Sequence, residues 1–129
     1  MCIRDRDTET LDLEIYRVLE DKYCNISGVR NLGADQCKSL YMVILDMDTL
    51  VNEEMAKKLL KLAKNNTSKN TAWKFNRVVP SNNRHPKHNQ PHPAVCLLRI
   101  IDYWRVGGCD EDFVGHYGFT DPTFWHRAN

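Results

Sequence analysis

Along this chain, stretches in which apolar and polar residues alternate are followed by stretches with helical spacing. Apolar and polar residues largely alternate over residues 11–19, which predicts a strand. Residues 41–46 form a short apolar run rich in Val, Ile and Leu, which is typical of a buried strand. Residues 71–79 and 93–99 also have the pattern of strands.

The segments between these strands carry the end signals of helices. Ser27 is expected to cap a helix that runs to about Ser39. The inner face of this helix is expected to carry Val29, Leu32, Gly33 and Cys37. Asn52 is expected to cap a second helix, in which acidic residues come first and lysines come later, as the helix dipole favours. The buried stripe of this second helix is expected to consist of Val51, Met55, Leu59 and Leu62.

The remaining segments predict a long loop and two further helices. Residues 80–93 contain four of the five prolines and three histidines, and a loop of this length is expected to have a function. A short helix is expected over residues 102–106, ended by Gly107 and Gly108, and another helix from about Asp121. Strands that alternate with helices predict an α/β protein, with a sheet flanked by helices.

The composition is that of an ordinary globular domain. The chain has 129 residues, 42% of them hydrophobic and 27% charged, with a formal net charge of +1. Such a balance gives no reason to expect a nucleic-acid partner or a membrane-surface patch. The apolar runs are too short for a transmembrane segment.

The two ends of the sequence predict a fragment of a longer protein. Residues 1–6 look like a translated adapter leader and are set aside, which leaves residues 7–129 as one partial domain. The pattern at the other end stops without an end signal. A cytoplasmic location is favoured. The Golgi lumen is the alternative, if a missing N-terminus carries a signal anchor.

The most informative chemistry follows the apolar run at residues 41–46. Asp46 and Asp48 are separated by one residue, so at the end of a strand both side chains would lie on one side, with Met47 on the other. Two carboxylates converging at the end of a central strand suit a hard cation such as Mg²⁺ or Mn²⁺. A cation of this kind is useful where a diphosphate leaving group must be neutralised.

Three segments occur in an order that resembles a known family. They are residues 24–34 (CNISGVRNLGA), residues 45–48 (LDMD) and residues 103–121, which contain YWRVGGCDEDF and GHYGFTD. Together they resemble a glycosyltransferase of the GT-A fold, similar to the family-2-type enzymes and to the galactosyltransferase C-terminal module. The resemblance implies a partial GT-A fold, with a Rossmann-like sheet flanked by helices. It also implies transfer from a nucleotide-sugar, most simply a UDP-sugar, to a hydroxyl acceptor such as a glycan.

The resemblance places donor and metal sites on particular residues. It implies that Asp46 and Asp48 bind Mn²⁺ or Mg²⁺ and the donor, with Asp48 as the main metal ligand. A third metal ligand would be His126, because some relatives supply a histidine late in the domain. The segment similar to G-x-R-N implies donor contacts from Gly28, Arg30 and Asn31. Arg30 near a helix N-terminus also suits an anionic phosphate on physical grounds.

The resemblance also places the acceptor side and the catalytic base. Residues 107–113 are similar to the family's G-G-F-D-E-D-F, which implies acceptor contacts from Trp104, Asp110 and Glu111. The family usually continues with G-W-E-D or G-Y-E-D, where a carboxylate acts as base in inverting members. Asp121 matches that carboxylate, and Asp112 is the reserve candidate. Two departures stand out, Thr120 where the family usually has Glu and Cys24 where it often has Trp.

Other readings of the same residues remain open at this stage. His85, His88, His92 and Cys96 have a spacing that is superficially that of a structural zinc module. The acidic residues near the C-terminus also allow a glycoside hydrolase with paired carboxylates. A third reading is a GT-A remnant without catalysis. A fragment that lacks the nucleotide-binding start of the fold is expected to bind donor poorly on its own and to be inactive.

Overall fold

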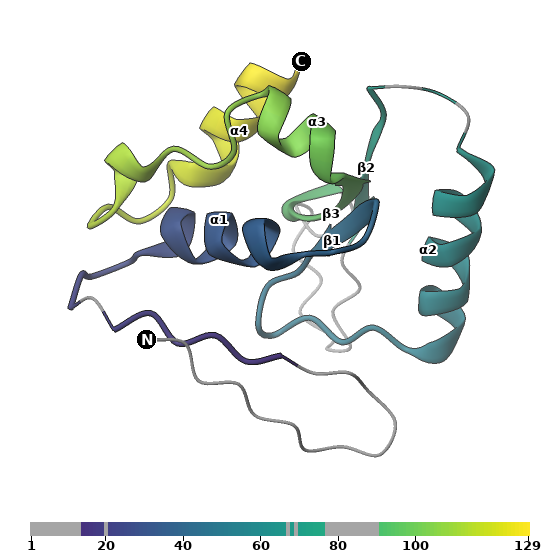
Figure 1. Ribbon diagram of the computed structural model, residues 1–129, viewed down its shortest axis with the longest axis horizontal. Coiled ribbons are helices and arrows are strands. Elements are labelled where there is room, and N and C mark those ends of the chain that lie inside the picture. Colours follow the sequence, from purple (N-terminus) through teal and green to yellow (C-terminus); the bar gives the residue numbers. More distant parts are fainter. Residues whose placement is uncertain (1–13, 20, 67, 69, 77–90) are drawn as a thin grey trace, which may run out of the picture.

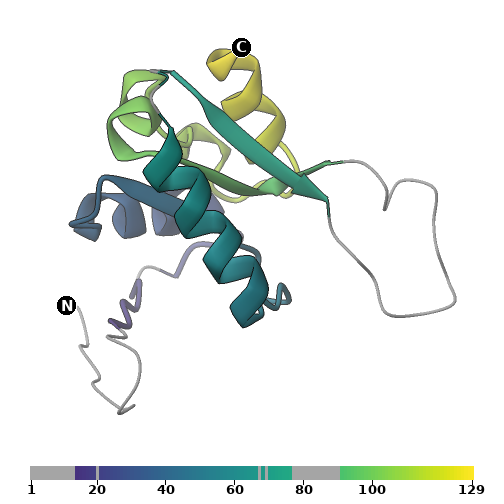
Figure 2. The same cartoon turned by 90° about the vertical axis from the view of Figure 1, so that its right-hand side faces the viewer.

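The computed structural model describes residues 14–19, 21–66, 68, 70–76 and 91–129. These residues form a mixed α/β structure in which helices lie on both sides of a small sheet (Figure 1). Helices α1, α3 and α4 cover one face, and α2 crosses the other face (Figure 2). The prediction of an α/β protein with a helix-flanked sheet is therefore confirmed.

The sheet consists of three strands in the order β1-β3-β2. β1 spans Tyr41–Ile44, β2 spans Ala72–Asn76, and β3 spans Pro91–Arg99. Both pairings are antiparallel, so the sheet of the described residues does not confirm the Rossmann-like arrangement. β3 is the middle strand, since it pairs with β1 along one edge and with β2 along the other. Its residues 94–98 are buried in succession, because helices cover both faces of the sheet there.

The strand that leads to the two aspartates lies at an edge of the sheet, and the expected central position is wrong. β1 ends at Ile44 instead of residue 46, and its Val43 side chain is 36% exposed. Beyond the strand, the N–H of Thr49 donates to the carbonyl of Asp46 across 3.0 Å, which closes a turn. The aspartates are therefore turn residues, and strand alternation does not orient them.

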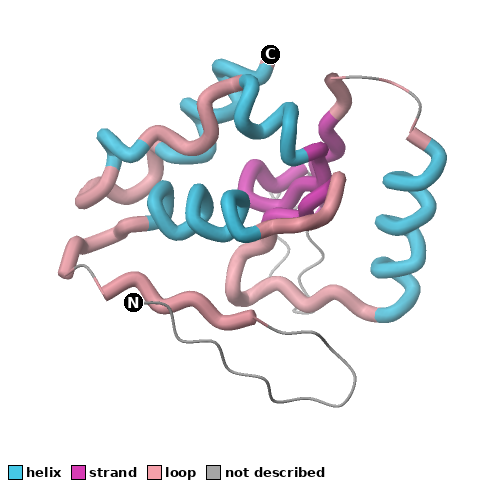
Figure 3. Tube along the Cα trace, in the orientation of Figure 1, coloured by secondary structure: helices cyan, strands magenta, loops and turns pink. Residues whose placement is uncertain are grey.

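Two other strand predictions also need correction. Residues 14–19, part of the expected first strand, have no regular secondary structure (Figure 3). Their alternating pattern finds no neighbouring strand to pair with among the described residues. Residues 91–93, expected to end a loop, begin β3 instead. The pairing of β3 with β2 is irregular there, which accommodates two prolines. Residues 11–13 and 77–90 lie outside the described residues.

The cap of the first helix lies two residues before the expected one, Ser27. α1 spans Ile26–Gln36, and its cap is Asn25, whose side chain accepts the N–H of Gly28. Gly28 leaves room for this cap, because a Cβ there would lie 2.4 Å from Asn25 Oδ1. The expected inner face is wrong in part: Leu32 and Cys37 are half-buried, but Val29 is 49% exposed, and the buried residues are Ser27 and Ala34. Gly33 is likewise exposed.

The other helices follow the sequence signals closely. α2 spans Glu53–Asn65 with Asn52 as its cap, and α3 spans Ile100–Arg105. A 3₁₀ turn, η2, covers Glu111–Phe113, and α4 covers Thr120–Ala128. Gly107 and Gly108 end α3 with positive φ angles, and the N–H of Gly108 donates to the carbonyl of Tyr103.

The hydrophobic core lies between the sheet and the helices α1, α3 and α4. It is formed by Ala34, Cys96, Leu98, Tyr103, Cys109, Phe124 and Trp125. Two further contacts hold α4 against the sheet. The indole N–H of Trp125 donates to the carbonyl of Pro93, and the ammonium group of Lys74 lies over the Trp125 ring. None of the helices in the described part of the chain is both long and apolar enough to cross a bilayer.

Candidate functional site

A polar cleft of about 960 Å³ opens where the first turn of α1, the turn after β1, the beginning of β3 and the first turn of α4 meet. Its charged or ionisable lining residues are Lys22, Arg30, Asp46, Asp48, His92, Tyr117 and Asp121. We call this the polar cleft. It brings together residues from all three segments that carry the family resemblance.

Asp121 is held in place by the helices on either side of the cleft. The buried hydroxyls of Ser27 on α1 and Thr120 on α4 are hydrogen-bonded at 3.1 Å, so the first turns of the two helices are tied together. Thr120 is where the family usually has Glu, and its short side chain fits this buried contact. The next residue, Asp121, then reaches Arg30 across the cleft.

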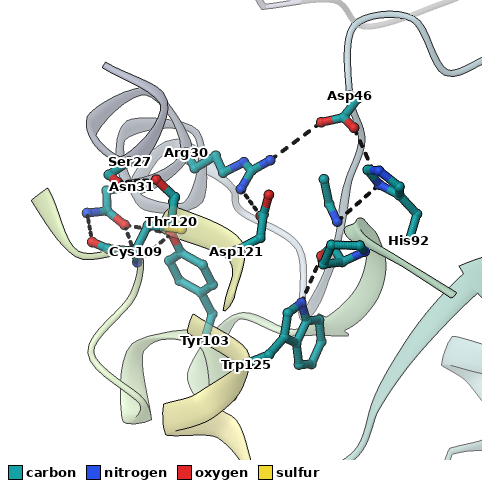
Figure 4. A network of polar contacts seen from close by, with 12 residues as sticks. Ser27, Arg30, Asn31, Asp46, His92, Tyr103, Cys109, Thr120, Asp121 and Trp125 are labelled. Carbon is teal, nitrogen blue, oxygen red and sulfur yellow. Dashed lines mark hydrogen bonds and ion pairs between the residues drawn. The ribbon is translucent and has the colours of Figure 1, made fainter. Parts of the chain in front are cut away.

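Arg30 is the electrostatic centre of the cleft. Its guanidinium donates to Asp121 Oδ1 and lies 3.5 Å from Asp46 Oδ1 (Figure 4). Burial acts to lower the pKa of Arg30, but the neighbouring charges of Asp121 and Asp46 raise this pKa above its ordinary value. Arg30 therefore stays charged, and its single positive charge is shared between two carboxylates from separate segments.

His92, one of the residues with zinc-like spacing, lies beside Asp46. Its Nδ1 lies 3.5 Å from Asp46 Oδ2 and also within 3.3 Å of the backbone N of Ala94. One nitrogen cannot accept from the Ala94 N–H and donate to Asp46 at once, so the two contacts are alternatives. The antiparallel register explains why His92 lies near Asp46. Ile44 of β1 pairs with Cys96 of β3, so the residues after Ile44 and those before Cys96 lie side by side.

Asp48 is exposed and lines the polar cleft together with Asp46. Two carboxylates with oxygen donors suit Mg²⁺ or Mn²⁺, which bind through one or two carboxylates plus phosphates and water. Among the residues that the structure describes, no group of three or more His, Cys, Asp or Glu side chains is placed to hold a metal ion. Binding of Mn²⁺ or Mg²⁺ by Asp46 and Asp48 therefore stays a prediction.

Asn31, predicted to contact the donor, does not line the polar cleft. Its amide group accepts from the Tyr103 hydroxyl at 2.6 Å and the Cys109 N–H at 2.9 Å, and it donates to the Cys109 carbonyl and to Glu111, both at 2.8 Å. These bonds tie α1 to the loop after α3. Donor contacts of Asn31 and Gly28 stay predictions, while both residues have clear structural roles.

The predicted acceptor residues gather away from the polar cleft, in the loop that Asn31 holds. Asp110 accepts the N–H of Asp112, as the cap of η2, and lies 3.4 Å from Arg127. Glu111 accepts from Asn31. Trp104, at the end of α3, lies edge-on against Tyr103, with ring centroids 5.1 Å apart. The acceptor contacts and the reserve role of Asp112 stay predictions.

His126 lies exposed in the last turn of α4 and does not line the polar cleft. Its predicted role as a third metal ligand thus stays a prediction. Of the zinc-module residues, His85 and His88 lie outside the described residues. Cys96 is buried in the core, where burial raises the pKa of its thiol to about 12, against a smaller lowering by the charge of Arg30.

A second hollow, of about 390 Å³, lies between α2 and the sheet. Its lining is mainly apolar, with Val43, Leu59, Phe75 and Val95 among its residues. Asp48 lines both hollows. The polar cleft is the candidate site because Arg30 there contacts acidic residues from two segments that lie far apart in the sequence.

Three ionisable residues that line the polar cleft, Lys22, His92 and Tyr117, are not among the site residues that the resemblance implies. His92 lies beside Asp46 because β3 runs antiparallel to β1, and knowing this pairing would have indicated it. Lys22 belongs to a segment that gives no local signal of a site. Comparisons with protein-family models, with curated proteins and with solved structures found no match to this chain.

Proposed function

We propose that this chain is part of a metal-dependent glycosyltransferase that moves a sugar from a nucleotide-sugar, of the UDP-sugar class, to a hydroxyl group of a glycan or similar acceptor. The observation that carries the proposal is the polar cleft itself. One cleft gathers Arg30, Asp46, Asp48 and Asp121, which lie far apart in the sequence. In this proposal the domain is a partial GT-A fold.

The charges of the polar cleft suit each part of such a donor. Arg30, with Lys22 on the same lining, offers positive charge to the two phosphates. Asp46 and Asp48 would hold Mn²⁺ or Mg²⁺, which when bound supplies a Lewis acid for the departing diphosphate. Asp121 would take the proton from the acceptor hydroxyl as its oxygen attacks the anomeric carbon, while the bond to the diphosphate breaks.

The first experiment is a thermal-shift titration with Mn²⁺, with and without UDP. We expect Mn²⁺ and UDP together to raise the melting temperature of the wild type, and Asp48→Asn to lose most of this shift. Asp35→Asn is the matched control, because Asp35 is exposed on α1 and does not line the polar cleft.

The outcomes separate the proposal from its alternatives. A shift with Mn²⁺ and UDP that Asp48→Asn abolishes and Asp35→Asn keeps supports a donor site. A folded wild type that gives no shift would leave a non-catalytic remnant as the better description. Stabilisation by Zn²⁺ alone, with no dependence on Asp48, would favour the metal-module reading.

A further inference from the structure

Arg30 occupies the position in the polar cleft where a cation and a phosphate would each need a partner. Its guanidinium contacts Asp121 and lies 3.5 Å from Asp46, and its side chain is only 13% exposed. Water therefore screens these charges poorly. One guanidinium is shared between two carboxylates, so it offsets part of their charge and competes with any other cation for Asp46.

This arrangement opposes the binding of a divalent cation by itself. Asp46 would have to serve the metal ion while the guanidinium stays beside it, and two positive charges at such a short range repel each other. Asp48 alone, exposed on the turn, offers a single carboxylate. A divalent cation without a phosphate partner must therefore compete with Arg30 for the carboxylate of Asp46.

A diphosphate changes the balance, because it offers Arg30 another anion. A guanidinium binds phosphate oxygens through paired N–H donors, as it binds carboxylates. Once Arg30 turns to the phosphates, Asp46 is free to bind the cation, and Asp121 loses its partner at the same time. One exchange of partners would thus make Arg30 available to the phosphates, Asp46 to the cation and Asp121 to the acceptor hydroxyl.

From this geometry we infer that Arg30 couples the binding of the diphosphate to the binding of the divalent cation, by exchanging Asp46 and Asp121 for the phosphates. The inference rests on the proposed function. Coupling between two ligands is reciprocal, so UDP tightens Mn²⁺ binding by the same factor as Mn²⁺ tightens UDP binding. Arg30 also keeps the candidate base paired until a donor is present.

The test measures the Kd of Mn²⁺ from the electron paramagnetic resonance signal of the free ion, without and with saturating UDP. The variants are Arg30→Gln and, in case that protein folds poorly, Arg30→Met, which keeps an unbranched apolar stem without the charge. Arg105→Gln is the matched control, because it removes the same charge from an arginine that also bridges two partners, Asp102 and Asn70, far from the cleft.

The neutral variants should change the two measurements in opposite directions. We expect Mn²⁺ alone to bind Arg30→Gln about tenfold more tightly than the wild type, because the competing charge is gone. The factor by which UDP tightens Mn²⁺ binding, expected to be about tenfold or more in the wild type, should fall several-fold. Arg105→Gln should leave both quantities as in the wild type.

The result also distinguishes failure of this inference from failure of the proposed function. If Mn²⁺ binds the wild type with UDP and depends on Asp48, but the Arg30 variants bind Mn²⁺ alone no more tightly, the coupling role is wrong and the donor site stands. An unchanged effect of UDP in those variants has the same meaning. If Mn²⁺ binds neither the wild type nor the variants, both proposals are wrong.

Discussion

At the scale of single residues, Asn31 shows how one side chain can hold a loop. Its amide accepts from Tyr103 and from the backbone of Cys109, and it donates to Cys109 and Glu111. Gly108 completes this arrangement, because with φ at +64° a Cβ there would lie 2.8 Å from Asn31 Oδ1. The loop after α3 is thus tied to α1 by bonds that only an asparagine can make at this place.

We expect Asn31→Ala to lower the free energy of unfolding by about 2–4 kcal/mol, because it breaks a partly buried network and removes the hydrogen-bond partner of the Cys109 carbonyl and of the Tyr103 hydroxyl proton. Urea unfolding followed by tryptophan fluorescence measures this loss. Asn65→Ala, at the exposed end of α2, is the control and should change stability by less than about 0.5 kcal/mol. Equal effects of the two substitutions would contradict the structural role of Asn31.

At the scale of elements, α2 is the helix whose signals are all local. Asn52 accepts the N–H of Met55 at 2.8 Å, and Glu53 and Glu54 pair with lysines one turn later. Leu59 is its buried contact with the sheet face. The sequence therefore predicts the cap and the charges of α2 well, since neither needs knowledge of the rest of the fold. Of the expected stripe, Leu59 is buried and Met55 and Leu62 are half-buried, but Val51 precedes the helix and is 37% exposed.

Removing the cap of α2 should have a modest and specific cost. Asn52→Ala is expected to lower the free energy of unfolding by about 1 kcal/mol, because the N–H of Met55 loses its partner at a helix start. Asn52→Asp keeps the capping oxygen and should retain wild-type stability. Chemical denaturation of the wild type, Asn52→Ala and Asn52→Asp measures the three free energies of unfolding. If Asn52→Asp is as unstable as Asn52→Ala, the loss of stability does not come from the helix cap.

The elements that the sequence does not predict depend on distant partners. Serine is a common helix cap, yet Asn25 caps α1, and the hydroxyl of Ser27 instead contacts Thr120 on α4. Asp46 was expected at the end of a central strand, but strand order is decided by β3, which lies much later in the chain. The grouping of Arg30, Asp46 and Asp121 was expected only through the family resemblance. No local pattern indicates it.

At the scale of the whole molecule, one core holds two groups that resist ionisation. Burial raises the pKa of Cys96 to about 12 from its ordinary value of 9.0. Burial, with the hydrogen bond to Cys109, also raises the pKa of Tyr103 above its ordinary range. Both residues belong to the core between the sheet and helices α1, α3 and α4, so their ionisation is linked to unfolding.

The free energy of unfolding should therefore fall as the pH rises above about 9. The unfolded chain releases the Cys96 proton near 9.0 and the folded chain only near about 12, so the folded state binds more protons in between. The contribution of Cys96 to stability is complete below pH 9 and is lost as the pH approaches 12. For a single group the slope approaches about 1.4 kcal/mol per pH unit.

Urea unfolding at pH values from 8 to about 10.5 measures this dependence. Cys96→Ala should have a shallower slope than the wild type, and Cys37→Ala, at a half-buried position outside the core cluster, should keep the wild-type slope. If Cys96→Ala and the wild type have the same slope, the thiol is not protected in the way the structure indicates.

The middle position of β3 has a consequence for how the chain is made. β1 and β2 leave the ribosome early, but neither pairs with the other, and both wait for residues 91–99 before any sheet can form. Asp121 emerges later still, so Arg30 meets this partner only after β3 has been synthesised. Helices α1 and α2 can form as soon as they are synthesised, because their hydrogen bonds are local. The sheet therefore waits for β3, and the charged cleft is completed only after α4 has followed it out of the ribosome.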